Sequence, residues 1–278
     1  MVPRSGSFAR IVTGRVLYTA AKAKYLNRRR KNMDWNKILN WKLLPGSHDF
    51  PGPDGGTCIN EAAAIAAGFK YRAITKVSDC PSCFSHMIAS YALLLNDKMP
   101  DDLRQELLMP FVTRLAGTAA SKEIEQQRAE LIFIRTVRDI LPILFQYYGD
   151  EGYIIKLCRE ARTLEGARYA ARCSRARVVD LVTDEIAHAA SCDFSSHAHL
   201  IANSCAFTAV LVAATARAAK KDLTAAAVKA AKKEIFSIAV SILDEAIRLG
   251  NPTADAIDVE TVKERMEAAK HSLAVAAS

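Results

Sequence analysis

Alanine-rich stretches with apolar residues at helical spacing constrain the fold of this chain more than any other feature. One of them reads TAAAVKAAKKEIFSIAVSILDEAIRLG, residues 224–250. Alanine has the highest helix propensity but little surface to bury, and aromatic residues make up only 7% of the chain. A chain rich in alanine and poor in aromatic residues is better suited to closely packed helices than to a β-sandwich. The sequence therefore predicts an all-α fold, a single multi-helix domain with an irregular Pro/Gly loop near the N-terminus.

Helix caps and breakers divide the chain into predicted helices. Thr57 and Gly68 bound one helix as N-cap and C-terminal glycine. Pro142 should kink or divide a second helix, and Gly250 should end a third. We expect helices at residues 34–44, 57–67, 79–97 with Pro81 in the first turn, 101–115, 121–148, 151–191, 198–219, 222–249 and 258–274.

Two segments do not fit this helical assignment. The loop at 46–56, GSHDFPGPDGG, places prolines and paired glycines directly before an alanine-rich helix, which excludes regular structure there. The segment FKYRAITKV, 69–77, alternates apolar and polar residues as a strand would. Because this segment has no evident partner strand, we expect an extended link or a short helix.

Positive charge is concentrated in the first 32 residues. They contain nine basic residues and no acid, whereas the whole chain has 38 basic and 30 acidic residues and a formal net charge of +8. Subtracting the nine leaves 29 basic residues against 30 acidic ones, so residues 33–278 are nearly neutral. The global basicity is therefore weak evidence that residues 33–278 bind nucleic acid. Such binding is expected only through residues 1–32.

The basic leader, residues 1–32, has three open interpretations. It resembles an organelle-targeting segment, it could be a basic tail that touches anionic surfaces, or it precedes a start at Met33. It lacks the long apolar run of a secretory signal. We expect the leader to lie outside the fold and residues 33–278 to form the helical domain, with a loop-containing part at 33–117 and a helical C-terminal part at 118–278.

Cysteine usage and hydropathy bear on the compartment. The chain has seven cysteines, an odd number, and no secretory signal. This combination is typical of reduced thiols in the cytoplasm and not of a disulfide framework. The uncharged run at 200–216 is shorter than the roughly 20 apolar residues of a membrane-spanning helix. It favours a buried central helix, and we predict no transmembrane segment.

The motif CPSCFSH carries the most specific chemistry in the sequence. Cys80 and Cys83 could bind one zinc ion, and His86 could supply a third ligand one turn later. Cys58 and His48, in or beside the Pro/Gly loop, could complete a tetrahedral site, which would explain the shape of the loop. The chain has no second Cys-x-x-Cys motif, which weakens the zinc interpretation.

The same cysteines allow two other interpretations. A Cys-Pro-x-Cys motif at a helix N-terminus lowers the pKa of its first thiol and supports dithiol redox chemistry. However, no strand–helix–strand pattern surrounds Cys80, as a thioredoxin-like frame would require. The simplest interpretation, which the pattern favours, is that Cys80 and Cys83 are small buried hydrophobic residues at the start of a helix.

A second cluster of polar residues lies near the middle of the chain. It comprises Asp180, Asp184, His188 and Cys192. These residues recur every fourth position, so neighbours share one helix face. Glu185 and His188 match the Glu-x-x-His spacing of di-iron bundles, but such a site needs two of these motifs and two more glutamates. The pattern therefore favours an ion-paired face. For the same reason, the arginines at 159–177 are expected to form a salt-bridged face.

Three quoted segments resemble a family of uncharacterised bacterial proteins. They are LLPGSHDFPGPDGGTCINEAA, SDCPSCFS and LNDKMPDDLRQELLMPFVTRLAG. The resemblance covers residues 35–117 closely and the alanine-rich remainder more loosely. It implies a bacterial source and a chain start near Met33, and it supplies no activity to transfer.

These observations favour an interaction or structural role over an enzyme. The sequence contains no P-loop, Rossmann, nucleophile-elbow or kinase signature. A protein partner is therefore the leading expectation. Zinc binding or thiol chemistry at the CPSC segment is the first alternative. Nucleic-acid binding through the leader, with a contribution from the 159–177 arginines, is the second.

Overall fold

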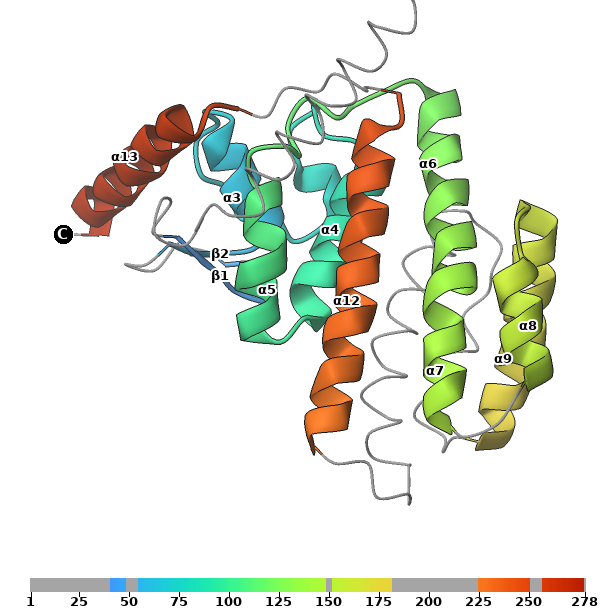
Figure 1. The fold of residues 1–278 in the computed structure, drawn as a ribbon. Coiled ribbons are helices and arrows are strands. Elements are labelled where there is room, and N and C mark those ends of the chain that lie inside the picture. Colours follow the sequence, from blue (N-terminus) through green and yellow to red (C-terminus); the bar gives the residue numbers. More distant parts are fainter. Residues whose placement is uncertain (1–40, 49–54, 149–151, 182–224, 251–256, 278) are drawn as a thin grey trace, which may run out of the picture.

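A bundle of helices with two very short strands at one side makes up the computed structural model shown in Figure 1. The structure describes residues 41–48, 55–148, 152–181, 225–250 and 257–277. The strands are β1 (Lys42–Leu43) and β2 (Gly55–Thr57), and the helices are α3 (Ile59–Ala66), α4 (His86–Lys98), α5 (Asp101–Leu108), α6 (Lys122–Arg135), α7 (Leu141–Tyr148), α8 (Gly152–Glu160), α9 (Leu164–Leu181), α12 (Ala225–Arg248) and α13 (Val259–Ala277). The predicted all-α class is confirmed.

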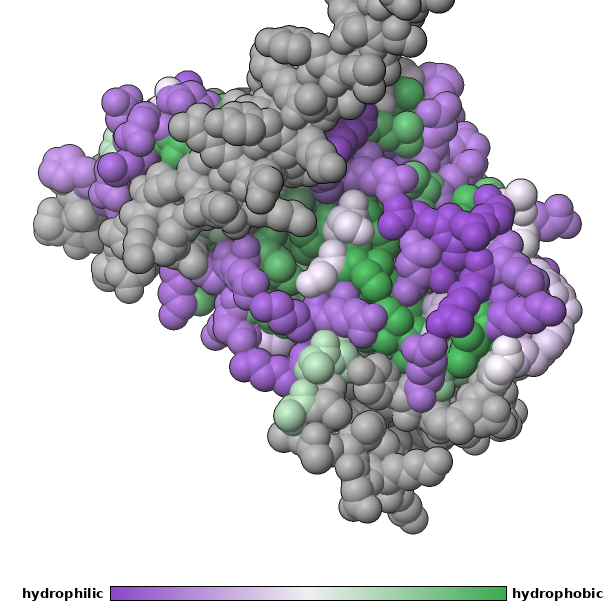
Figure 2. All heavy atoms as spheres, in the orientation of Figure 1, coloured by the Kyte–Doolittle hydropathy of each residue, from purple (hydrophilic) through white to green (hydrophobic). Residues whose placement is uncertain are grey.

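Helix α12 lies in the middle of the bundle. It contacts α4 and α5 on one side and α6 on the other (Figure 1). Helices α8 and α9 pack beyond α7 at one end, and α13 packs on α3 at the other. Figure 2 shows hydrophilic residues over the outward face of α6 and hydrophobic residues between α6 and α12. Buried side chains from Trp41 to Met266 form one continuous core.

Local sequence signals fix the ends of several helices. Ser85, Ser121 and Asp258 each accept the backbone N–H three residues ahead, at 3.1, 3.4 and 3.1 Å. Each cap satisfies a donor that the first helical turn leaves unpaired. Gly68 and Gly250 follow α3 and α12 with φ of +90° and +82°, a region that favours glycine. Both glycine stops were predicted from the sequence.

The long helix predicted at 121–148 is divided near Pro142, as expected. Residues Thr136–Ile140 form a π-helical segment, called η3, between α6 and α7. Pro142 has no N–H to donate to the carbonyl of Arg138, so a regular α-helix would lose a hydrogen bond there. The wider η3 segment lets the helix continue past this position.

The predicted helix at 34–44 is wrong at its C-terminal end. Lys42 and Leu43 form β1, which pairs in parallel with β2 at Gly55–Thr57. Trp41 and Leu43 are buried and Lys42 is exposed, which is the alternation of a strand. Part of the loop expected to lack regular structure, Gly55 and Gly56, therefore belongs to a strand.

Three other helix boundaries also differ from the prediction. The helix expected to contain Pro81 begins only at His86, after a single 3₁₀ turn at Val77–Asp79. The helix expected at 101–115 ends at Leu108, two residues before Pro110. The helix expected at 151–191 is interrupted at 161–163, between α8 and α9. Within the part of the chain that the structure describes, no helix is long and apolar enough to cross a membrane, and the run at 200–216 lies outside that part.

Arginine side chains from other helices close the C-terminal ends of three helices. Arg104 donates to the last carbonyls of α4 at 2.5 and 2.6 Å. Arg128 donates to the carbonyls at the end of α12 at 3.0 and 2.9 Å. Arg265 donates to Ala66 at the end of α3, at 2.7 Å. These contacts satisfy carbonyls that have no partner within their own helix and place positive charge at the negative helix ends.

Candidate functional site

A buried carboxylate, Glu61, holds together the segments around the Pro/Gly loop. Glu61 lies in the first turn of α3 and is 1% exposed. Its Oε1 accepts hydrogen bonds from Ser47 Oγ at 3.0 Å, the His48 amide at 3.3 Å and the Ile74 amide at 2.9 Å. Its Oε2 accepts the Cys58 amide at 2.9 Å. One side chain thus ties the described start of the loop to α3 and to the segment after α3.

Two side chains from α4 and α5 fix the small sheet against the bundle. Asn96 donates to the Leu44 carbonyl at 2.8 Å and accepts the Ile59 amide at 3.2 Å. Gln105 donates to the Trp41 carbonyl at 2.6 Å and accepts the Leu43 amide at 2.9 Å. The strands and the N-terminus of α3 are therefore held by side chains about 40 to 60 residues away in sequence. The described ends of the Pro/Gly loop are parts of a fixed frame.

Cys58 is the N-cap of α3 and is completely buried. Its Sγ accepts the Glu61 amide at 3.4 Å, while Glu61 accepts the Cys58 amide in return. This reciprocal arrangement is a capping box with a thiol in the place usually taken by serine or threonine. Burial, followed by the negative charge of Glu61, raises the pKa of the Cys58 thiol far above its ordinary value. A neutral thiol used as a helix cap is poorly suited to bind a metal ion.

The CPSC segment lies in a turn before α4 and not in the first turn of a helix. Cys80 is buried, Cys83 is partly buried and His86 is exposed at the first position of α4. Burial, with smaller contributions from Asp79 and Glu61, raises the pKa of Cys80 to about 11. The redox interpretation expected a helix N-terminus to lower this pKa, and the structure gives the opposite direction.

The residues proposed as zinc ligands are not brought together. Among the described residues, no group of three or more His, Cys, Asp or Glu side chains could hold a metal ion. His48 lies at the end of a described segment, and its Nε2 is buried without a hydrogen-bond partner among the described residues. The zinc interpretation therefore gains no support from the geometry of the motif.

The second predicted cluster lies mostly outside the described residues. Asp180 belongs to the last turn of α9. Asp184, His188 and Cys192 follow the end of that helix and fall in residues 182–224, which the structure does not describe. The predicted ion-paired face of this cluster stays a prediction.

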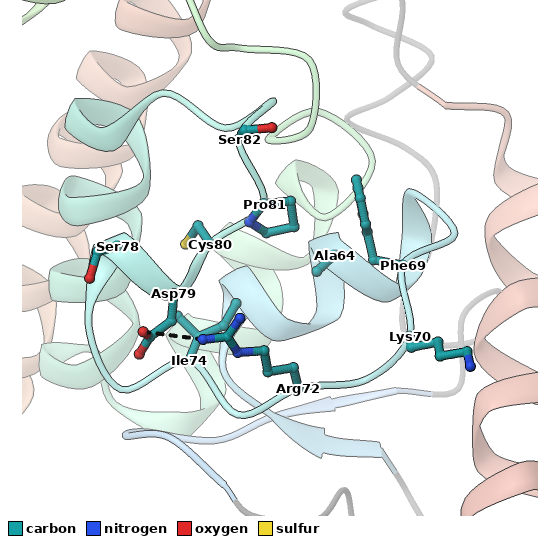
Figure 3. A pocket seen from close by; sticks show the side chains of 10 residues that line it. All are labelled: Ala64, Phe69, Lys70, Arg72, Ile74, Ser78, Asp79, Cys80, Pro81 and Ser82. Atoms are coloured by element: carbon teal, nitrogen blue, oxygen red, sulfur yellow. Dashed lines mark ion pairs between the residues drawn. The ribbon is translucent and has the colours of Figure 1, made fainter.

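An open hollow of about 380 Å³ lies beside the CPSC turn. We call it the Phe69 hollow. Its lining residues are Ala64, Phe69, Lys70, Arg72, Ile74, Ser78, Asp79, Cys80, Pro81 and Ser82. In Figure 3, Phe69 and Ala64 face Cys80 and Pro81 across the hollow, Arg72 extends toward Asp79 along one edge, and Lys70 points away. The hollow therefore combines apolar walls with one charged edge.

Hydrogen bonds fix the charged edge of the hollow. Asp79 Oδ2 accepts the hydroxyl and the amide of Thr75 at 2.9 and 3.2 Å, and the amide of Lys76 at 3.1 Å. The hydrogen bond from the Thr75 hydroxyl is the largest cause that holds the pKa of Asp79 below its ordinary value. The other oxygen, Oδ1, lies 3.6 Å from the Arg72 guanidinium, whose side chain is 71% exposed. Arg72 is thus directed by Asp79 but largely open to solvent.

Sequence reasoning missed the residues that build this region. Glu61 was visible only as one acid at the start of a helix, and its burial depends on contacts with Ser47 and Ile74 that no local pattern encodes. Phe69 and Arg72 appeared as alternate residues of an extended link. That link was expected from the sequence, and residues 69–74 are irregular as predicted. In the sequence, the available signal for a surface site was a phenylalanine followed by two basic residues, at positions 70 and 72.

The environments of the thiols predict their order of alkylation. At pH 8, raising a thiol pKa from 9.0 to about 11 lowers its reactive thiolate fraction about 100-fold. We expect iodoacetamide to modify Cys83 first, Cys80 much more slowly and Cys58 only on unfolding. Peptide mapping by mass spectrometry over time measures each rate, with urea-unfolded protein as the control in which all three react alike. Equal rates for Cys80 and Cys83 in the folded protein would contradict this assignment.

Comparisons with known proteins assign no function to this region. No family model, curated protein or solved structure matches the chain. The bacterial source implied by the sequence resemblance therefore stays a prediction.

Proposed function

We propose that this protein is an interaction protein that binds a partner polypeptide through the Phe69 hollow. The observation that carries the proposal is an exposed phenylalanine, 44% accessible, at the wall of a hollow whose edge holds an exposed arginine. Aromatic residues, phenylalanine among them, and arginine are enriched in protein interfaces.

The size of the hollow limits what it can accept. Pockets for small molecules typically have volumes of roughly 300–1,000 Å³, and the Phe69 hollow, at about 380 Å³, is at the low end. It is open and its walls come from one short stretch of chain and from α3. These properties suit one large apolar side chain of a partner better than an enclosed ligand.

The charge at the edge indicates what should accompany that apolar side chain. Among the described residues, Arg72 contacts one acid, Asp79, at 3.6 Å, and Asp79 is already occupied by three other donors. The Arg72 guanidinium therefore has donors free to pair with a carboxylate in the fork geometry that arginine and carboxylates share. The proposed partner segment carries an Asp or Glu next to a large apolar residue.

The frame beneath the hollow favours binding without large rearrangement. The Ile74 amide is anchored by Glu61, and the turn that follows is anchored by Asp79. A surface that is already ordered loses less conformational entropy when a partner binds. The Phe69 hollow therefore differs from a loop that would have to fold on binding and lose more entropy.

A selection of random peptides displayed on phage tests the proposal. We expect selected peptides to contain an acid next to a large apolar residue and to bind at least about tenfold more weakly to the Phe69→Ala variant. Arg72→Gln should weaken the same peptides, and replacing the peptide acid by its amide should abolish the effect of Arg72→Gln. Isothermal titration calorimetry measures the affinities.

The matched control is Tyr153→Ala, which removes an exposed aromatic ring on α8, at the far end of the bundle from α3. This variant should bind the selected peptides as the parent protein does. The proposal fails if no peptide depends on Phe69, or if the selected peptides lose as much affinity for Tyr153→Ala as for Phe69→Ala.

A further inference from the structure

The α8–α9 hairpin presents a second surface, separate from the Phe69 hollow. Two tyrosines, Tyr153 and Tyr169, are 66% and 48% exposed on it. Five basic residues lie with them between residues 152 and 174: Lys156, Arg159, Arg162, Arg168 and Arg172. Arg168 is partly exposed and the other four are exposed. We call this set of seven residues the basic–aromatic face. It lies at the edge of the bundle opposite α13 (Figure 1).

Helical spacing gathers these side chains on the outer face of the hairpin. Tyr153, Lys156 and Arg159 recur every third residue along α8, and Arg168 and Arg172 are one turn apart on α9. The apolar residues between them, including Ile154, Cys158, Ala167 and Ala170, are buried against the bundle. The side chain of Tyr153 lies close enough to Tyr169 to raise the pKa of Tyr169, so the two tyrosines are neighbours.

The salt-bridged face that the sequence predicted for these arginines does not form among the described residues. No acidic side chain there pairs with any of the five cations. Residues 152–174 contain only two acids, Glu160 and Glu165, against these five cations, which gives a net charge of +3. By contrast, Arg135 and Arg138 on the neighbouring α6–η3 segment both pair with Asp139. Among the described residues, no acid neutralises these five cations, which leaves their charge available to an external anion.

We propose that the basic–aromatic face binds single-stranded nucleic acid. Cations that have no internal partner can contact successive phosphates. Exposed aromatic rings give unpaired bases a surface on which to stack, whereas the bases of a duplex are already stacked inside it. Both features occur together here, and the exposed tyrosines select the single strand over the duplex. The sequence had named the 159–177 arginines beside residues 1–32 as possible phosphate contacts, and the structure adds the two exposed tyrosines that lie among them.

Fluorescence anisotropy of a labelled oligothymidylate, titrated with the full chain at several salt concentrations, tests the proposal. Tyr153→Ala combined with Tyr169→Ala should weaken binding about tenfold or more, and the two Tyr→Phe changes should preserve it because the rings remain. Arg159→Gln combined with Arg162→Gln should reduce the slope of log affinity against log salt by about 1.4, or roughly 0.7 per lost phosphate contact.

Two controls separate this face from the basic leader. The pair Lys122→Gln and Lys263→Gln removes the same charge from exposed positions on α6 and α13 and should leave the tyrosine-dependent binding unchanged. An oligonucleotide that carries 5-iodouracil should cross-link to Tyr153 or Tyr169 on irradiation, as mapped by mass spectrometry. Circular dichroism of every variant should match the parent protein, since the replaced side chains lie outside the core.

Three results would overturn the proposal. Cross-links confined to residues 1–32, with all variants binding like the parent protein, would assign binding to the leader alone. A duplex bound as tightly as the single strand, with no effect of the Tyr→Ala changes, would remove the stacking role. Tighter, arginine-dependent binding to phosphatidylserine vesicles than to the oligonucleotide would make the face a membrane-contact surface.

Discussion

Replacement of Arg128 by methionine is expected to lower the free energy of unfolding by about 4 kcal/mol. The substitution deletes a fully buried guanidinium and leaves its hydrogen-bond acceptors without a donor. Arg128 is 0% exposed. It donates to Thr118 at 2.7 Å, to Glu125 at 2.7 Å and to the carbonyls of Ala246 and Leu249. Methionine is apolar and of similar length, so it leaves those carbonyls buried without a donor.

Urea unfolding monitored by circular dichroism measures this loss. The matched control is Lys233→Met, which also replaces a cation by methionine. Lys233 pairs with Glu106 at 3.1 Å, but both side chains are more than half exposed, so the cost should be below about 0.5 kcal/mol. Arg128→Lys should fall between the two, because one ammonium cannot reach all of the acceptors that the guanidinium joins. An Arg128→Met protein as stable as Lys233→Met would show that water satisfies the α12 carbonyls.

Glu61→Ala is expected to destabilise the fold by about 3 kcal/mol, because the buried amides of Cys58 and Ile74 lose their acceptor and each unsatisfied donor costs about 1–3 kcal/mol. The Ser47 hydroxyl and the His48 amide lose the same acceptor. The damage should be local, because the carboxylate joins segments that lie around α3. Glu61→Gln should cost less, since it keeps one acceptor oxygen and the side-chain volume.

Hydrogen exchange distinguishes this local effect from general destabilisation. In Glu61→Ala the amides of Cys58 and Ile74 should exchange faster, while the amide of Ile88, capped by Ser85 at 3.1 Å, should not. Glu106→Ala, at an exposed carboxylate, serves as the control and should leave all three amides unchanged. Equal acceleration at Ile88 would mean that Glu61 supports the whole bundle and not the frame of the Phe69 hollow.

Several features of the fold could be predicted from short stretches of the sequence. The helix predicted at 222–249 is α12 at Ala225–Arg248, because apolar residues at helical spacing and a glycine after the last turn are local signals. The division near Pro142 and the start at Asp258 were found for the same reason. The helix at Pro81 was misplaced because proline also suits turns, and Ser85 offered a competing cap.

The cysteines show that a local sequence motif does not determine the chemistry of its residues. The spacing of Cys80 and Cys83 is compatible with a zinc ligand pair, a redox pair or two buried thiols. Only tertiary contacts decided that Cys58 caps α3 and that burial raises the pKa of Cys80. Burial acts through every neighbouring atom, so the direction of a pKa shift cannot be inferred from the motif alone.

The sequence by itself determined the helical class and the main helix stops, and it left residues 69–77 as an extended link or a short helix, of which 69–74 are irregular and Val77 begins a 3₁₀ turn. Tertiary structure alone decided which polar groups are buried and what satisfies them. Glu61 meets partners as many as 14 residues away in the chain and Arg128 as many as 121. Propensity and periodicity act over a few neighbouring residues, whereas a buried charge is stable only where folding brings distant donors or acceptors within hydrogen-bond distance. That the five cations between residues 152 and 174 have no acidic partner among the described residues was likewise evident only once folding had shown which acids lie near them.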